Sequence, residues 1–267
     1  MPLPFTQVDA FAHGPFSGNP AAVYVLESYP SDDFLAKVAC EMNLSETAFV
    51  VRTGPSSFDL RWFTPNTEVD LCGHATLGAA HALFEDGEIE GDEVSFHTRS
   101  GALAVTRNQD RSLTMNFPTE EPRGRPRPAD LETMLGAPVA WYGENRMDAF
   151  VQLDQPGWVR SLDPDMSSIA RLPVRGLIVT ATGDAPEYDF ISRFFAPQSG
   201  VPEDPVTGSA HCALAPFWHD RLGSPKLTGF QASARGGRVQ VEHDGDRVLL
   251  TGRAVTVLRG ELLVDPE

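Results

Sequence analysis

The first half of the chain alternates between strand-like and helix-like spacing of its apolar residues. β-Favouring runs at Thr6–Phe11 and Ala21–Leu26 flank a turn rich in glycine and proline. After Ser31, apolar side chains recur every three to four residues, which predicts a helix that closes at Asn43. Further strands are expected at Thr47–Arg52, Phe58–Phe63, Glu93–Thr98, Ala102–Arg107 and Ser112–Phe117, with a helix at about His74–Glu85.

The segment 119–129 interrupts this pattern, because it is rich in proline and arginine and has no large apolar side chain. It predicts a linker between an N-terminal lobe, residues 1–118, and a C-terminal lobe, residues 130–267, with terminal segments that can cross between lobes. The second half is expected to hold helices at Ser161–Arg171 and from Ser209 to Asp220, and strands at Asp148–Leu153, Leu177–Thr182, Arg238–Glu242, Arg247–Thr251 and Ala254–Leu258.

Two stretches of the chain repeat one plan of strand, polar turn and helix start. Phe58–Ala82 matches Tyr188–Ala213, with Gly73 opposite Gly208, and the matched positions keep a nearly constant offset. This pattern predicts an internal duplication into two pseudo-symmetric lobes that meet at a cleft. Helix N-termini at Gly73 and Gly208 would offer free N–H groups to an anion, and a small carboxylic acid fits such a pocket.

The amino-acid composition and net charge argue against several classes of function. The 267-residue chain is 41% apolar and carries a formal net charge of −16, which argues against nucleic acid or an anionic membrane as a partner. No apolar run approaches the roughly 20 residues of a membrane span. Three cysteines without CxxC spacing predict neither a disulfide framework nor a structural metal site, so we expect a cytoplasmic protein with reduced thiols and no bound metal.

Polar residues at the turns are the candidates for chemistry, although each has an ordinary structural interpretation. Glu46 lies at a helix-to-strand junction, where it is either a solvated carboxylate or a general acid/base. His74 either caps a helix or moves a proton. Asp204 and Ser209 suit helix capping as well as substrate binding. Cys72 beside the same helix start is either an inert buried thiol or a catalytic one.

The alignment of the repeats places only one carboxylate in the pair of sites. The position that corresponds to Glu46 falls near Arg175–Gly176, and the position that corresponds to Cys72 is Thr207. A racemase with two opposed bases needs an acid and a base on both faces of its substrate. One carboxylate better suits a reaction in which the same group removes a proton and returns it to another carbon on one face.

Four motifs in order, VDAFAHGPFSGNPAAV, NLSETAFV, RWFTPNTEVDLCGHATLGAAH and EDPVTGSAHCAL, resemble those of the PhzF-like, phenazine-biosynthesis-like isomerase family. The resemblance runs from about Val8 to the C-terminus. It implies an α/β fold like that of diaminopimelate epimerase, in which each of two lobes wraps a barrel-like sheet around a central helix. The reaction it implies is a cofactor-free proton shift like that on trans-2,3-dihydro-3-hydroxyanthranilate, carried out by a homodimer.

The resemblance also implies roles for individual residues. Glu46 in the NLSET motif corresponds to the general acid/base, and His74, Asp204 and Ser209 correspond to the polar surround of the substrate. We expect His74 and Asp204 to hold the polar groups of the substrate and to assist proton transfer. The expected substrate-binding residues are Asn19, Gly73, Thr207, Gly208 and Ser209. No cofactor and no metal are implied.

Two rival functions stay open at the level of sequence. One is a cofactor-independent epimerase or racemase that uses Cys72 and Glu46 as a mixed acid and base. The other is a non-catalytic protein that binds a small acid on the same fold. Neither the substrate nor the pathway follows from the motifs.

Overall fold

The computed structural model describes residues 2–265, and the chain divides into two compact units. The first unit runs to Asn116 and takes up the chain again at Thr251; the second unit is Phe117–Leu250. Segment 119–129 lies within the second unit, where it contributes the short strand β9 (Arg123–Gly124). The chain from Thr251 onward, placed by the sequence in the C-terminal lobe, belongs to the first unit and forms β18 (Ala254–Leu262) there.

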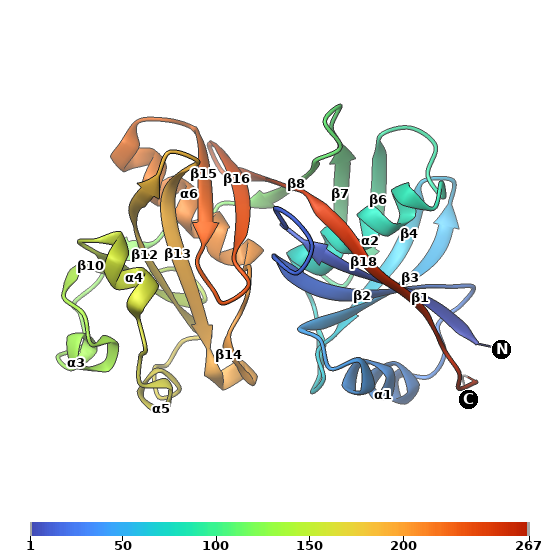
Figure 1. The fold of residues 1–267 in the computed structure, drawn as a ribbon, viewed down its shortest axis with the longest axis horizontal. Coiled ribbons are helices and arrows are strands. Elements are labelled where there is room, and N and C mark those ends of the chain that lie inside the picture. The colour runs from blue at the N-terminus through green and yellow to red at the C-terminus, as the bar shows by residue number, and fades with distance from the viewer. Residues whose placement is uncertain (1, 266–267) are drawn as a thin grey trace. The chain divides into compact units, whose positions relative to one another are not determined.

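The first unit is built from a mixed sheet that includes both ends of the described chain. β1 pairs antiparallel with β2 on one side and with β18 on the other (Figure 1). β2 runs parallel to β3, and β4 continues the sheet antiparallel to β3. The elements of this unit are β1 (Leu3–Ala10), β2 (Asn19–Leu26), α1 (Asp32–Met42), β3 (Glu46–Gly54), β4 (Ser57–Phe63), β5 (Glu68–Val69), α2 (Gly73–Glu85), β6 (Glu93–Thr98), β7 (Gly101–Arg107), β18 and most of β8 (Leu113–Pro118).

Helix α2 is the central helix of the first unit. It packs against β1, β2, β3 and β18, and nine of its residues are buried. Most of these residues are alanine, glycine or another small side chain, which lets the surrounding strands approach the helix axis closely. A helix that is apolar on every side is stable only inside a core. This burial fixes both ends of α2, including the start at Gly73.

Helix α1 covers the outer side of the same sheet. Ser31 caps it by accepting a hydrogen bond from the Phe34 amide, and Asn43 ends it in the left-handed conformation. Its buried residues Leu35 and Val38 join an apolar cluster with Tyr24 of β2. Because α1 ends at this cap, the chain enters β3 with Glu46 as the first residue of the strand.

The second unit repeats the use of one buried helix among strands. α6 is buried at ten positions and packs against β15 and β16. The elements of this unit are β9, α3 (Leu131–Leu135), β10 (Val139–Glu144), β11 (Asp148–Leu153), α4 (Pro156–Ser161), α5 (Met166–Ile169), β12 (Gly176–Ala185), β13 (Tyr188–Ala196), the 3₁₀ turn η1 (Pro197–Ser199), β14 (Val201–Glu203), α6 (Gly208–Leu222), β15 (Lys226–Gln231), β16 (Gly237–Asp244) and most of β17 (Arg247–Gly252).

A proline inside α6 ties the helix to the chain segment that enters the second unit. Pro216 has no N–H, so the carbonyl of Cys212 one turn earlier loses its helical donor. That carbonyl accepts a hydrogen bond of 3.1 Å from the backbone amide of Glu120 instead. The buried carbonyl is thereby satisfied, as buried backbone groups usually are.

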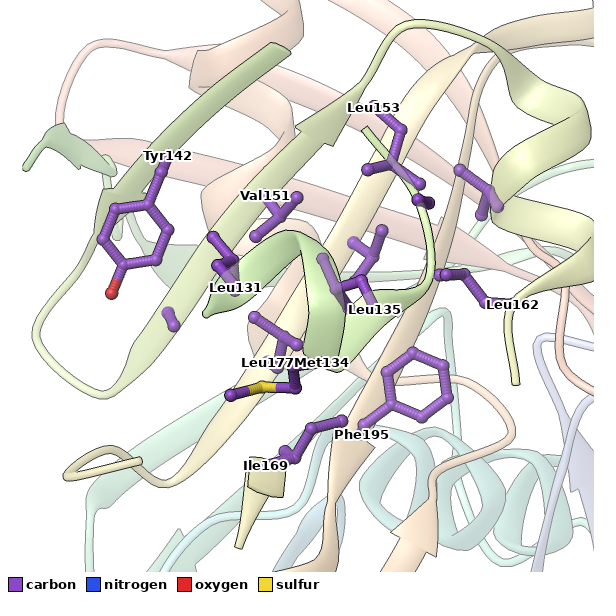
Figure 2. Packing of buried hydrophobic residues seen from close by; sticks show 14 of the residues in the cluster. Leu131, Met134, Leu135, Tyr142, Val151, Leu153, Leu162, Ile169, Leu177 and Phe195 are labelled. Carbon is purple, nitrogen blue, oxygen red and sulfur yellow. The ribbon is translucent and has the colours of Figure 1, made fainter. Parts of the chain in front are cut away.

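The short helices of the second unit cover one side of its sheet. Leu131 and Leu135 of α3 pack onto Val151, Leu177 and Phe195 of the strands, as Figure 2 shows. All five side chains have at most 2% of their surface exposed. This apolar cluster supports β11, which begins at Asp148, and β12, which begins directly after Arg175.

The structure corrects one predicted helix. The expected helix Ser161–Arg171 is wrong, because α4 ends at Ser161 and α5 spans only Met166–Ile169. Pro164 restricts the residue before it to extended conformations, and the Asp165 carboxylate caps a new helix. The sequence interpretation also missed α3, β10 and β15. None of the helices among residues 2–265 has the length and apolar character needed to cross a membrane.

Candidate active site

Glu46 and His74 form the centre of a polar cluster in the first unit. Glu46 is the first residue of β3, and His74 is the second residue of α2. Glu46 Oε2 lies 3.1 Å from His74 Nε2, and 17% of the Glu46 side chain is exposed against 5% of His74. The contact is close but not aligned as a hydrogen bond, and neither atom has another hydrogen-bond partner among the described residues. The carboxylate is therefore near the imidazole without being held rigidly by it.

The other nitrogen of His74 faces two different groups. Asn19 Nδ2 lies 3.1 Å from His74 Nδ1, and the Cys72 sulfur lies 3.5 Å from the same nitrogen. Asn19 is the first residue of β2, and Cys72 is the N-cap of α2. His74 is thus surrounded within its own unit by the ends of two strands and its own helix start.

Burial governs the protonation of this cluster. It raises the pKa of the Cys72 thiol to about 11, an effect to which the Glu46 carboxylate adds and which His74 opposes. Burial works against a charge on His74, but Cys72 and Glu46 raise the His74 pKa well above its usual 6.5. A thiol with a pKa of about 11 is uncharged near neutral pH, so Glu46 is the group that favours a positive His74 there. Cys72 can donate a hydrogen bond at neutral pH, but it is a poor base.

Glu46, Cys72 and His74 also have the chemistry of metal ligands, since one donor atom of each lies within 4.8 Å of the others. His74, however, presents Nδ1 to Cys72 and Nε2 to Glu46. An ion bound to one ring nitrogen would leave the other of these contacts unused. The arrangement suits proton transfer through the ring better than binding of a single metal ion.

In the second unit, the turn before α6 is held by a buried glutamine. Gln231 of β15 accepts a 2.9 Å hydrogen bond from the Thr207 amide and donates a 2.7 Å hydrogen bond to the Asp204 carbonyl. The Thr207 hydroxyl donates to the Asp204 carboxylate. Thr207 is the N-cap of α6, and Gly208 is the first helical residue. Asp204 therefore braces the turn that precedes the helix N-terminus.

Ser209 lies in the first turn of α6 and is joined to a buried ion pair. Arg175 donates a 2.9 Å hydrogen bond to the Ser209 hydroxyl. The same guanidinium contacts both carboxylate oxygens of Asp148 at 2.9 and 2.5 Å. Burial raises the pKa of Asp148, which Arg175 opposes. Because its oxygen accepts from Arg175, the Ser209 hydroxyl keeps its own hydrogen for another acceptor.

The structure thus brings four of the sequence candidates, Asn19, Glu46, Cys72 and His74, into one cluster in the first unit. Asp204, Thr207, Gly208 and Ser209 gather around the start of α6 in the second unit. The sequence interpretation assigned no role to Gln231 or Asp148. The sequence offered a reason to examine Arg175, because it lies where the repeat places the counterpart of Glu46. Gln231 offered none, because the strand that contains it carries no motif.

The backbone at the two buried helix starts is similar. The residue before each helix is extended, with φ −144° and ψ 107° at Cys72 and φ −115° and ψ 105° at Thr207, and each helix begins at a glycine. Comparison with solved structures places the whole arrangement among folds of the diaminopimelate-epimerase-like type. A hydroxyproline epimerase from Agrobacterium vitis aligns over 99% of this chain and 94% of its own with a TM-score of 0.61, at 13% identity, so it speaks for the fold alone. The mixed α/β fold class expected from the sequence is confirmed.

Relatives of higher identity define the family more narrowly. The family model for phenazine biosynthesis-like proteins matches residues 8–260. A protein of Pseudomonas aeruginosa named as an uncharacterized isomerase is 49% identical over 98% of this chain and 99% of its own. The crystal structure of a phenazine biosynthesis protein of the PhzF family from Enterococcus faecalis is 42% identical, covers 99% of this chain and 100% of its own, and has a TM-score of 0.94. The chain belongs to the phenazine biosynthesis-like, PhzF family.

Proposed function

We propose that the protein is a cofactor-independent isomerase that shifts a proton on a small carboxylic acid. The observation that carries this proposal is the contact between Glu46 and His74, in which a partly exposed carboxylate meets a buried imidazole at 3.1 Å. Part of the Glu46 side chain is exposed, its Oε2 is buried and makes no hydrogen bond among the described residues, and the ring beside it can donate a hydrogen. Relatives named as isomerases support the general class of reaction.

In the proposed reaction, Glu46 acts as the base and then as the acid. Its carboxylate removes a proton from a carbon next to an unsaturated system, and the electron pair left behind delocalises over that system. The Glu46 carboxylic acid then returns the proton to another carbon, so that the carboxylate is regenerated and no redox partner is needed. In this reaction the His74 ring, whose Nε2 lies 3.1 Å from Glu46 Oε2, would turn to donate its Nε2–H to the charged carboxylate and so stabilise that form.

The remaining site residues keep the roles that the resemblance implies, as parts of the same proposal. Amides at Gly73 and Gly208 would bind the substrate carboxylate, because helix N-termini present free donors. Thr207 and Ser209 would add hydroxyl contacts, and Asp204 would hold the turn in place while it assists proton transfer. A homodimer also stays a prediction, which light scattering on the purified protein would test.

The test is the substitution Glu46→Gln, which keeps the shape of the side chain and removes the base. General acid–base catalysis by one group is worth about 10²–10⁴-fold, so turnover should fall by that amount while ligand binding persists. Substrates can be sought by thermal stabilisation with a library of small carboxylic acids, since a ligand of the native state raises the melting temperature. Exposed Glu41→Gln is the matched control. Wild-type turnover in Glu46→Gln would exclude the proposed mechanism.

One alternative has a specific observation in its favour. Cys72 contacts the same imidazole as Glu46, so an epimerase with a thiol acid and a carboxylate base would find both groups in place. The high pKa of the thiol fits a proton donor at neutral pH rather than a base. Deuterium uptake from heavy water at a stereocentre, without migration of a double bond, would favour this alternative.

A further inference from the structure

Asn19 is fully buried, and its side-chain amide faces the imidazole nitrogen that is turned away from Glu46. The earlier expectation for Asn19 was direct substrate binding. The amide nitrogen lies 3.1 Å from His74 Nδ1, and an NH₂ group can only donate. Nδ1 must therefore act as the acceptor in this contact, which requires it to carry no hydrogen.

We infer that Asn19 is a positioning residue that keeps the ring proton of His74 on Nε2, where it faces the Glu46 carboxylate. This inference rests on the proposed function for its catalytic meaning, but the position of the proton is a property of the protein alone. In a neutral imidazole one nitrogen donates and the other accepts, so a donor at Nδ1 decides the tautomer. The hydrogen bond made by one ring nitrogen commonly fixes the role of the other in this way.

The groups around the His74 ring have opposing effects on its protonation. Cys72 lies 3.5 Å from the same nitrogen, and its thiol, which keeps its hydrogen at neutral pH, competes with Asn19 for the one lone pair of Nδ1. Glu46 attracts a positive ring. On β1, which also packs against α2, the Asp9 carboxylate accepts the Phe16 amide at 2.9 Å. A second proton on Nδ1 would require Asn19 to turn its amide oxygen toward the ring, so Asn19 opposes the charge that Glu46 favours.

The loop before Asn19 is built to hold the residue in place. Gly18 has φ +74°, and a Cβ there would lie 2.2 Å from the Ala10 carbonyl oxygen, so the position requires glycine. The buried Ser17 hydroxyl accepts hydrogen bonds from the His13 and Gly14 amides and donates to the Gly14 carbonyl. Asn19 then enters β2 opposite Ala10. A tightly held loop fixes the amide against the ring, as a positioning role demands.

Nitrogen-15 NMR of histidine-labelled protein tests the inference without any substrate. The His74 signals are assigned by their loss in His74→Gln. The pH is raised until the ring signals show that it has become neutral, and the neutral wild-type ring should carry hydrogen on Nε2 and none on Nδ1. A neutral ring with its hydrogen on Nδ1 would overturn the inference. Because the wild-type protein gives this result, the inference is tested without any variant of Asn19.

Variants then separate positioning from substrate binding. Asn19→Asp replaces the donor by an acceptor, so Nδ1 should gain a hydrogen and kcat should fall at least tenfold with little change in KM. Asn19→Ala should give a mixture of tautomers and a smaller loss of kcat. Asn108→Asp is the matched control, because the Asn108 amide donates to the hydroxyls of Ser112 and Thr114 and not to a histidine among the described residues. An unchanged tautomer in Asn19→Asp, or a rise in KM at constant kcat, would contradict the inference.

Failure of the inference and failure of the proposed function give different results. If Glu46→Gln keeps its turnover, the catalytic proposal fails while the NMR result for His74 stands. If Glu46→Gln loses turnover but the neutral ring carries its hydrogen on Nδ1, the positioning role of Asn19 fails alone.

Discussion

Asp148 is held at both carboxylate oxygens by the Arg175 guanidinium, whereas Glu46 meets His74 through a single contact that is not aligned as a hydrogen bond. Each pair lies beside the start of a buried helix in its own unit. The Asp148 carboxylate has no exposed surface and no freedom to turn, so it serves structure. Glu46 has some exposed surface and a loosely held carboxylate, which are the properties that a proton carrier needs.

Removing Arg175 should destabilise the protein. Arg175→Met keeps the length of the side chain but leaves the buried Asp148 carboxylate without its cation. Such a loss costs about 3–5 kcal/mol in a fully buried pair, and we expect less here because the Arg175 side chain is 36% exposed. Urea denaturation measures the change in the free energy of unfolding.

Two controls accompany Arg175→Met: one also changes its ion-pair partner Asp148, and the other changes an exposed arginine. The double variant Arg175→Met with Asp148→Asn removes both charges and should recover part of the lost stability. Exposed Arg171→Met should change stability little, since the guanidinium bonds to the Ser167 carbonyl and the Ser168 hydroxyl of the adjacent helix α5 at the surface. Equal stability of Arg175→Met and wild type would show that Asp148 does not depend on this cation.

Cys72→Ser should distinguish the proposed isomerase from the thiol-dependent epimerase. Serine can still donate to His74 Nδ1, so an isomerase that uses Glu46 should lose less than about tenfold in turnover. An epimerase that needs the thiol as its acid should lose roughly 10²-fold or more. Exposed Cys40→Ser controls for thiol removal as such. Turnover is measured with proton exchange in heavy water, which reports both reactions.

His211 should make the second unit sensitive to acid. It is fully buried, and burial lowers its pKa to about 4, with a small opposing effect from the Thr207 carbonyl that accepts from its Nδ1. The unfolded chain binds this proton at about pH 6.5, so the folded state is fully favoured above that value and loses stability as pH falls toward 4. The difference amounts to roughly 3 kcal/mol.

The test compares the free energy of unfolding of the wild type and of His211→Asn at pH 7 and near pH 4.5. The asparagine amide can replace Nδ1 as donor to the Thr207 carbonyl but does not titrate. This variant should lose the His211 part of the acid sensitivity. His97→Asn, at an exposed position, should keep it. A His211→Asn protein with the full wild-type pH dependence would contradict the assignment.

The sequence predicted the parts of the site that depend on local chemistry. Glycine at the helix start placed His74 at the N-terminus of α2, and the end of α1 placed Glu46 at a strand entry. The bracing contacts were beyond local reasoning, because Gln231 meets Thr207 and Arg175 meets Ser209 only after distant strands have paired with each other. The orientation of Asn19 toward His74 likewise depends on the pairing of β1 with β2.

The elements of the fold also divide into those that the local sequence predicts and those that depend on distant partners. Apolar segments such as Asp148–Leu153 were predicted at their observed bounds. The helix predicted across Pro164 was wrong because apolar spacing was given more weight than a helix breaker. Strand β10 was missed although Val139, Trp141 and Tyr142 favour strands, and its pairing with β9 and β11 fixes its register.

The pairing of β1 with β18 has a consequence for how the protein emerges from the ribosome. The second unit is continuous in sequence, so it can fold as soon as Phe117–Leu250 has been synthesised. The edge of β1 that pairs with β18 stays uncovered until Ala254–Leu262 has been synthesised. An uncovered strand edge invites pairing with other chains, so nascent chains that stall before β18 should be the most prone to aggregate.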